Sequence, residues 1–309
     1  MKLQDYVKYL VCIFTLHLQS FLCDVNIIDQ ANDASNNVRN ERGVIDLVFG
    51  KLRTCGSCLC GRANRGFAKF LAGEDSTSHE YPWLAIINNN GNFLNGVLIN
   101  DRFVLTAASP FVEISLPKIR VTLGQYNRHN HDISSTDYSV ESIIKHPEYD
   151  PNSHAHDLAL IRLSRPTVFE KRVQPVCLPN PGSTYLGQVG TITGWVLTED
   201  GKNTSVPRKL GLPILGSNEC IKSGIKVENF HSDSGCIGVL GGKSFTCKED
   251  VGASVLYRSY TDVYDLVGIL SDLNDCKIED NRKSSMYTRV GPHLDWILQN
   301  TSNACYCTK

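Results

Sequence analysis

The chain has 309 residues, of which 41% are hydrophobic and 20% are charged, and its formal net charge is −1. This composition is typical of a soluble globular protein, and the length suits one large domain or two small barrels with an N-terminal extension. The nearly neutral charge gives no reason to expect nucleic acid or an anionic membrane as a partner. Twelve cysteines in a non-repetitive sequence favour disulfides in an oxidising compartment over a metal or redox role.

Residues 1–23 have the features of a secretory signal peptide. Two lysines supply positive charge, and Tyr9–Leu22 supplies the apolar core. This run is too short and too often interrupted by polar residues for a membrane anchor, and no other stretch is long and apolar enough to span a bilayer. Ser20 and Cys23 are the candidate last residues, and we prefer Cys23. We therefore expect a secreted, extracellular protein.

Residues 24–69 are expected to form a pro-segment. Up to Arg53 they are polar and rich in asparagine, a composition typical of loose segments. A cluster of cysteines, Cys55, Cys58 and Cys60, follows. No second pair of cysteines or histidines lies at the spacing of a zinc site, so disulfides are the expected use of this cluster.

Beyond Trp83 the pattern is one of short β-prone runs separated by turns. Asn90-Gly91 between two apolar runs predicts a hairpin. Further strands are expected at Phe103–Thr106, Ile119–Leu123, Tyr138–Ile144, Leu158–Leu163, Thr191–Trp195, Lys209–Leu215, Val255–Tyr257, Leu266–Leu270 and Met286–Val290. A closing helix is expected over Pro292–Asn300. Many short strands and one terminal helix predict an all-β protein built from barrels.

Three motifs in fixed order carry the functional signal: T-A-A-S-P at 106–110, H-D-L-A-L at 156–160, and C-K-E-D-V-G-A-S at 247–254. Their order and spacing resemble those of the chymotrypsin/trypsin-like serine protease family, which has T-A-A-H-C, D-I-A-L and C-x-G-D-S-G-G-P. The resemblance begins at Phe70 and extends to about Asn300. It implies two six-stranded antiparallel barrels with a C-terminal helix, and it assigns residues 70–309 to a trypsin-like domain.

The resemblance places the catalytic triad at Ser109, Asp157 and Val251, where the family has histidine, aspartate and serine. Val251 has no heteroatom that could attack a carbonyl, and the serine hydroxyl is too weak a base to accept a proton near neutral pH. Loss of the nucleophile or the base alone lowers turnover roughly 10⁶-fold in an enzyme of related chemistry, about 8 kcal/mol of barrier. We therefore expect the chain not to be an enzyme.

The substrate-binding side is altered as well. By resemblance, Glu249 replaces the oxyanion-hole glycine, and Phe245 stands at the base of the primary specificity pocket. Asp272-Leu273 replaces the W-G edge that pairs with an extended substrate, and Ser285 replaces a glycine of the pocket wall. Catalytic and binding sites that are altered together argue against proteolysis.

No other group in the sequence is expected to restore the chemistry. His154 and His156 precede Asp157 and are interpreted as surface histidines. The His129–His131 pair lies in a polar loop without a third ligand, and the same loop lacks the glutamates that a calcium site requires. We predict no metal and no cofactor.

The resemblance also implies an activation site. Lys69 stands at the basic residue cleaved in the family, and the new ammonium of Phe70 would pair with Asp250. Alternatively, backbone donors satisfy Asp250 and no cleavage occurs. Sequons at Asn203 and Asn300 predict glycosylation.

The cysteines fit the same scheme, because ten remain if the signal is cleaved after Cys23. The family pattern implies a Cys220–Cys236 bridge and a Cys247–Cys276 bridge, with Cys177 bonded to the pro-segment. Two further bridges are expected between the remaining cysteines of the two chain ends, in a connectivity that the sequence leaves open: two of Cys55, Cys58 and Cys60 with Cys305 and Cys307.

The function that this pattern favours is that of a secreted, non-catalytic serine protease homologue that acts by binding proteins. The inactive arthropod members of the resembled family serve as cofactors, decoys or adaptors in proteolytic or immune cascades, so the expected partners are cascade proteases or their substrates. One alternative is an active secreted endopeptidase with an atypical site. Another is a plain secreted component of a fluid or venom.

Overall fold

The computed structural model describes residues 53–64, 73–130, 132, 135–196, 204–240, 246, 250–271 and 284–309. These residues belong to one compact unit, 52–309. The expected signal peptide, 1–23, and the polar part of the expected pro-segment lie outside the described residues. Within the described part of the chain, no helix has the length and apolar character needed to cross a membrane.

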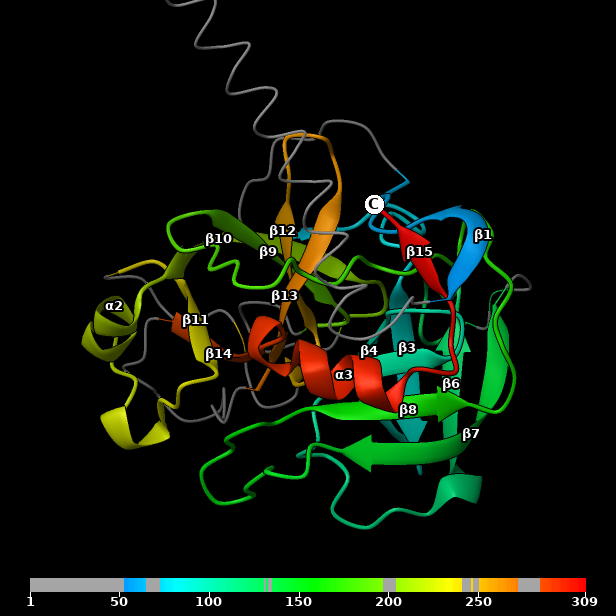
Figure 1. Ribbon diagram of the computed structural model, residues 1–309, viewed down its shortest axis with the longest axis horizontal. Coiled ribbons are helices and arrows are strands. Elements are labelled where there is room, and N and C mark those ends of the chain that lie inside the picture. Colours follow the sequence, from blue (N-terminus) through cyan, green and yellow to red (C-terminus); the bar gives the residue numbers. More distant parts are fainter. Residues whose placement is uncertain are drawn as a thin grey trace, which may run out of the picture. The chain divides into compact units, whose positions relative to one another are not determined.

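The first half of the unit is a closed antiparallel barrel with the strand order β3-β4-β5-β8-β7-β6 (Figure 1). Its strands are β3 (Leu84–Asn89), β4 (Asn92–Leu98), β5 (Phe103–Thr106), β6 (Ile119–Leu123), β7 (Thr136–Lys145) and β8 (Ala159–Leu163). The predicted hairpin joins β3 to β4. Asn90 and Gly91 both have positive φ, 53° and 92°, as a tight hairpin turn requires, and these are residue types that tolerate it.

The second half is a sheet with the order β11-β14-β13-β12-β9-β10, which a further pairing of β11 with β10 closes into a barrel. Its strands are β9 (Val189–Gly194), β10 (Arg208–Leu215), β11 (Ser234–Gly238), β12 (Ser254–Arg258), β13 (Tyr264–Leu270) and β14 (Ser284–Arg289). The short strand β2 (Glu74–Asp75) pairs with the beginning of β10. The predicted fold class, two six-stranded antiparallel barrels with a C-terminal helix, is confirmed.

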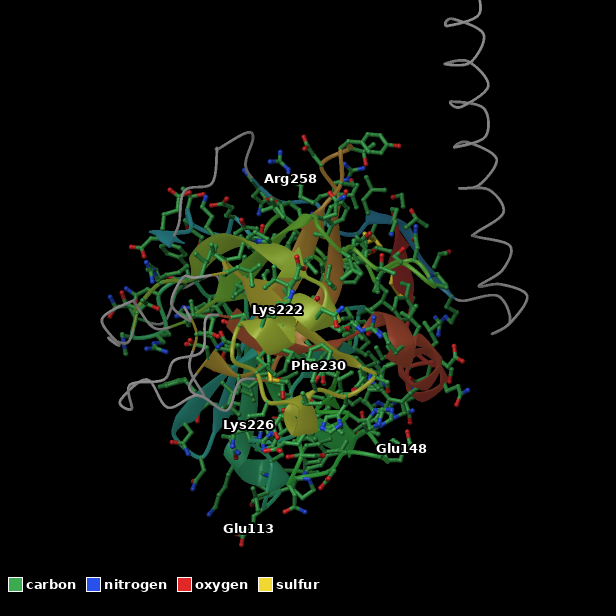
Figure 2. The ribbon with its side chains drawn as sticks, turned by 90° about the vertical axis from the view of Figure 1, so that its left-hand side faces the viewer. Glu113, Glu148, Lys222, Lys226, Phe230 and Arg258 are labelled. Carbon is green, nitrogen blue, oxygen red and sulfur yellow. A yellow bond between two sulfur atoms is a disulfide. The ribbon has the colours of Figure 1, made fainter. Side chains whose placement is uncertain are left out.

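Helices are few and short among the described residues. The C-terminal helix α3 (Leu294–Asn300) follows the 3₁₀ turn η4 (Gly291–His293), which matches the predicted closing helix. The remaining elements are η1 (Leu116–Lys118), α2 (Ser217–Lys222) and η2 (Val227–Asn229). Figure 2 shows α2, marked by Lys222, on one face of the second barrel together with Phe230, which packs on Cys220 and Cys236.

Two main apolar clusters fill the unit. The larger contains buried residues of the first barrel such as Phe103 and Leu160 and extends to residues of the second half such as Ile269, and the other lies in the second barrel around Ile192 and Val255. Outside the barrels, β1 (Thr54–Leu59), near the N-terminal end of the described residues, runs parallel to β15 (Tyr306–Thr308) near the C-terminus.

Candidate functional site

The centre of the site is the carboxylate of Asp157, which is completely buried. Asp157 lies just before β8, and Ser109 lies three residues after β5. Because β5 and β8 are paired through Thr106 and Ala159, the ends of the two segments lie side by side. The fold therefore brings the first two triad positions together.

Four donors surround this carboxylate. The backbone N–H groups of Ala108 and Ser109 each donate to Oδ1 at 2.7 Å. The Ser109 hydroxyl donates to Oδ2 at 2.9 Å, and the Ser271 hydroxyl donates to the same oxygen at 2.6 Å. Both oxygens of a buried charge are thus hydrogen-bonded, as burial requires. The serine at the histidine position acts here as a donor to the aspartate and so does not serve as a base.

The third triad position, Val251, is 7% exposed and packs with the apolar interior of the first barrel. It lies in a tight turn in which Ala253 N donates to Asp250 O at 3.1 Å and Gly252 N donates to Leu270 O at 3.0 Å. Gly252 has a φ of 88°, and a Cβ at this residue would lie 2.3 Å from Asn95 O. The turn that presents a nucleophile in active proteases is therefore formed, but it presents an aliphatic side chain.

His154, interpreted from the sequence as a surface histidine, is only partly exposed. Its side chain is 21% exposed, and its Nδ1 lies 3.6 Å from Asp157 Oδ2, beyond a normal hydrogen bond. His154 has a φ of 56°, an uncommon conformation for a non-glycine residue. This conformation places the imidazole next to the aspartate, where it makes no hydrogen bond to Ser109 or Val251 among the described residues.

The residues that would pair with the activated N-terminus are described only in part. Asp250 is completely buried, whereas Lys69 and Phe70 lie outside the described residues, so cleavage and pairing stay predictions. The segment that follows is docked on β10. Arg208 donates to Gly73 O, and buried Lys209 contacts Glu74 at 3.1 Å.

Lys209 also binds the buried Glu80, whose two oxygens lie 2.9 and 3.1 Å from the ammonium nitrogen. Burial by itself would raise the pKa of Glu80. The hydrogen bonds from Lys209 and from the backbone of Thr77 outweigh that effect and lower the pKa below its ordinary value. The Lys209 ion pairs thus hold the region after the expected cleavage site against the second barrel.

Of the substrate-pocket positions, the structure describes Ser285. It is buried in β14, and its hydroxyl has no hydrogen-bond partner among the described residues. Four pocket residues, both cysteines of one expected bridge and one sequon lie outside the described residues: Phe245, Glu249, Asp272, Leu273, Cys247, Cys276 and Asn203. At the other sequon, Asn300 Nδ2 donates to Trp296 O at 2.8 Å, so the nitrogen that would carry a glycan is already bonded within α3.

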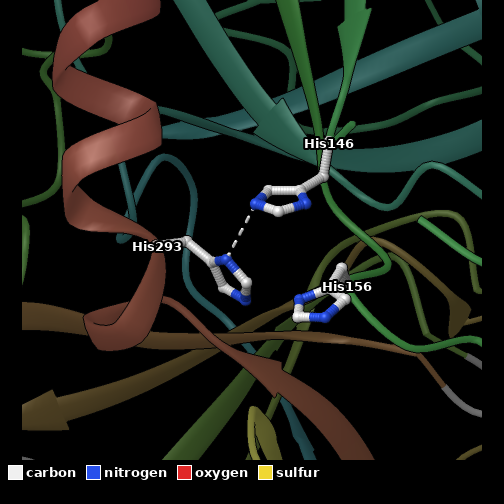
Figure 3. Close-up of side chains that lie close together, drawn as sticks. All are labelled: His146, His156 and His293. Atoms are coloured by element: carbon white, nitrogen blue, oxygen red, sulfur yellow. Dashed lines mark hydrogen bonds between the residues drawn. The ribbon is translucent and has the colours of Figure 1, made fainter. Parts of the chain in front are cut away.

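One cluster of titratable residues was missed by the sequence analysis. His146, His156 and His293 lie together, and Asp233 bonds two of them (Figure 3). His156 reaches the surface only in part, because its side chain is 26% exposed and faces other rings. His146 and His293 are 147 residues apart in the sequence. No local spacing signals such a cluster, since it forms only when the barrel and the C-terminal helix pack together.

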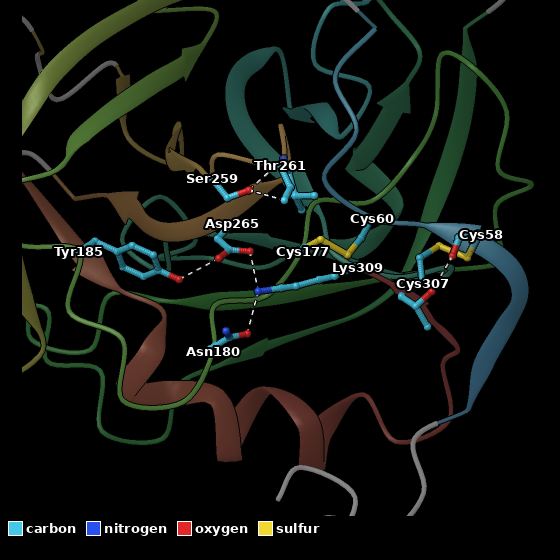
Figure 4. The surroundings of a disulfide bond; sticks show 12 residues. Cys58, Cys60, Cys177, Asn180, Tyr185, Ser259, Thr261, Asp265, Cys307 and Lys309 are labelled. Carbon is cyan, nitrogen blue, oxygen red and sulfur yellow. Dashed lines mark hydrogen bonds and ion pairs between the residues drawn. A yellow bond between two sulfur atoms is a disulfide. The ribbon is translucent and has the colours of Figure 1, made fainter. Parts of the chain in front are cut away.

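The chain ends are joined by disulfides (Figure 4). Cys55 bonds Cys305, Cys58 bonds Cys307, and Cys60 bonds Cys177, while Cys220 bonds Cys236 within the second barrel. The terminal Lys309 adds contacts of 2.8 Å to both Asp265 and Asn180. The cysteine-rich part of the expected pro-segment, residues 54–60, is therefore a fixed part of the folded body.

Comparison with known proteins agrees with this architecture. A family model described as trypsin matches residues 70–297. Phenoloxidase-activating factor 3 of Holotrichia diomphalia is 35% identical over 256 residues, which cover 75% of this chain and 72% of that protein. Phenoloxidase-activating factor 1 of the same insect is 32% identical over 260 residues, covering 75% and 70%. Vitamin K-dependent protein C of Mus musculus is 33% identical over 229 residues, covering 70% and 48%. The chain belongs to the trypsin-like serine protease family.

Proposed function

We propose that this protein is a secreted, non-catalytic serine protease homologue that acts by binding other proteins. The observation that carries the proposal is Val251, an aliphatic and almost completely buried side chain at the nucleophile position. Acyl transfer requires a nucleophilic atom and a base beside it. Ser109 supplies no base, because its hydroxyl donates to Asp157.

The network around Asp157 supports the same reading. In an active triad one carboxylate oxygen accepts a bond from the catalytic imidazole and thereby orients it. Here the corresponding oxygen, Oδ2, accepts from two serine hydroxyls, those of Ser109 and Ser271. The aspartate thus has a role in holding two loops together.

The relatives suggest where such a protein acts. Two of them are named phenoloxidase-activating factors, and members of this family act in proteolytic cascades. We infer that this chain acts in an insect-type immune cascade as a cofactor, decoy or adaptor. Its partners would be a cascade protease or that protease's substrate. Cleavage after Lys69 would act as a conformational trigger for binding and would have no role in catalysis.

Two experiments on the purified full chain test these statements separately. The first is exposure to an organofluorophosphonate probe and to peptide substrates, before and after limited cleavage at Lys69; we expect neither labelling nor hydrolysis. An active endopeptidase would be labelled stoichiometrically.

The second experiment measures phenoloxidase activation in the source fluid after the protein has been removed with an antibody. Adding back the wild type should restore the output. The Ser109→Ala variant should restore it equally well, because binding needs no hydroxyl at that position. No change on removal would support the alternative of a plain fluid component, and failure of a Ser109→Ala variant that is still folded under the assay conditions would point to chemistry at the site.

A further inference from the structure

Three imidazole rings from distant segments meet at the junction of the first barrel with the C-terminal helix (Figure 3). We refer to His146, His156 and His293 as the three-histidine cluster. His146 follows β7, His156 immediately precedes Asp157, and His293 ends η4. The centroid of the His146 ring lies 5.0 Å from that of His156 and 4.6 Å from that of His293. His146 and His293 are buried, whereas His156 borders solvent.

The nitrogen atoms of the cluster converge. One ring nitrogen from each histidine lies within 4.8 Å of the other two. His146 Nε2 and His293 Nδ1 are 3.2 Å apart. Two imidazole nitrogens bound to one tetrahedral Zn²⁺ at 2.0–2.1 Å are separated by about 3.4 Å. The buried pair therefore already has nearly the spacing of two zinc ligands, and the partly exposed His156 would approach by up to about 1.4 Å to complete the set.

Asp233 orients the cluster in the way that an outer carboxylate orients metal-binding histidines. It is buried, and its Oδ2 accepts from His293 Nε2 at 3.1 Å and from the backbone N–H of His156 at 3.0 Å. This fixes a proton on His293 Nε2 and leaves the lone pair of Nδ1 directed toward His146. Asp233 Oδ1 is buried without a hydrogen-bond partner among the described residues, and His156 Nδ1, which makes no hydrogen bond there either, lies 3.3 Å from Asp233 Oδ2. Buried polar atoms of this kind call for a further partner.

The other ring nitrogen of His146 does not oppose ligation. His146 Nδ1 accepts a 3.3 Å bond from the exposed Glu148 N–H. Ligation through Nε2 would move the ring proton of His146 to Nδ1. The backbone N–H of Glu148 would then donate to water instead, which costs little because Glu148 is exposed.

We propose that the three-histidine cluster binds Zn²⁺, with Asp233 as the outer carboxylate and water as the fourth ligand. Imidazole nitrogens are ligands that suit Zn²⁺, and a bound ion would give the reoriented ring of His156 a partner. The ion would tie the loop that carries Asp157 to the C-terminal helix. The sequence predicted no metal because only ligands that are close along the chain give a recognisable spacing, whereas the fold alone brings these three histidines together.

The test is a calorimetric titration of the chelator-treated, dialysed full chain with ZnCl₂ alone. We expect one Zn²⁺ per chain and a higher melting temperature with the ion than without it. His146→Gln and His293→Gln should abolish this binding, and Asp233→Asn should weaken it about 10- to 100-fold. His129→Gln is the matched control, because it removes an exposed histidine outside the cluster and should change nothing.

Because His146 and His293 are buried, their variants could fail to fold, so His156→Gln decides the matter. Its side chain borders solvent, and its circular dichroism in chelator should match that of the wild type. We expect its Zn²⁺ affinity to fall at least about 10-fold, and the visible spectrum of tetrahedral Co²⁺ in the wild type to be lost. Wild-type protein that binds no stoichiometric Zn²⁺ would overturn the proposal. So would undiminished binding in His156→Gln, or binding lost only in His129→Gln.

Discussion

Replacing Ser109 by alanine distinguishes a structural site from a catalytic one. Ser109 Oγ donates to Asp157 Oδ2 at 2.9 Å, and the carboxylate is completely buried. A buried hydrogen bond to a charged group contributes about 1.5–3 kcal/mol. We expect Ser109→Ala to lower the free energy of unfolding by about 2 kcal/mol and the melting temperature by about 4–8 °C.

The assay is urea unfolding followed by tryptophan fluorescence, at fixed pH and with disulfides intact. Thr122→Ala is the matched control, because it removes another hydroxyl–carboxylate bond, 2.6 Å long, to the exposed Asp137. That bond competes with water, so its loss should cost only a few tenths of a kcal/mol, about the size of an ordinary surface change. A Ser109→Ala variant as stable as the wild type, or more stable, would refute the reasoning. Polar residues that serve catalysis commonly lower the stability of the fold, so a variant of equal or greater stability would indicate a functional role for Ser109.

Three further predictions concern the docked segment, the chain ends and the repair of the site. Lys209→Met should destabilise the fold by about 3–5 kcal/mol, because it leaves Glu80 buried without its partner; an effect below about 1 kcal/mol in urea unfolding would contradict this. Because the pKa of Glu80 is lower in the folded state than in the unfolded state, ionised Glu80 contributes to the free energy of unfolding at pH values above its unfolded pKa. This contribution should be lost as the pH falls below about 4.5, and Lys209→Met should not show that loss. Limited cleavage after Lys69 should give fragments that separate on a gel only after reduction, because disulfides join residues 55–60 to the body; release without a reductant would contradict that connectivity. Restoring Ser109→His and Val251→Ser together should yield little peptidase activity, because the pocket substitutions remain; robust hydrolysis by this variant would show that they matter less than proposed.

Much of the strand architecture follows from local sequence. Phe103–Thr106 and Ile119–Leu123 were predicted with the same bounds as β5 and β6, because they are compact runs of β-branched and apolar residues between clear turns. Strand β11 was not predicted. Its sequence, S-G-C-I-G, has low β propensity, and it is held by its neighbours: a Cβ at Gly235 would lie 2.4 Å from the ring of Tyr287.

The candidate site also has parts that the sequence predicts and parts that it does not. Motif order identifies the positions of Ser109 and Val251, because the family motifs are preserved around the altered residues. The double use of Asp157 Oδ2 and the docking of β1 on β15 depend on contacts between distant segments. The three-histidine cluster is the extreme case, since a single contact within it joins residues 147 apart. Hydrophobic patterns and secondary-structure propensities concern residues that are close along the chain, whereas this cluster consists of residues that are close only in the folded structure.

The most direct test of the central claim is active-site titration of the full chain after cleavage at Lys69, with a fluorophosphonate probe and mass spectrometry of the intact protein. The account requires an unmodified mass under conditions that label trypsin completely, because Val251 offers no atom to phosphonylate. A single stoichiometric adduct on any residue beside Asp157 would contradict it.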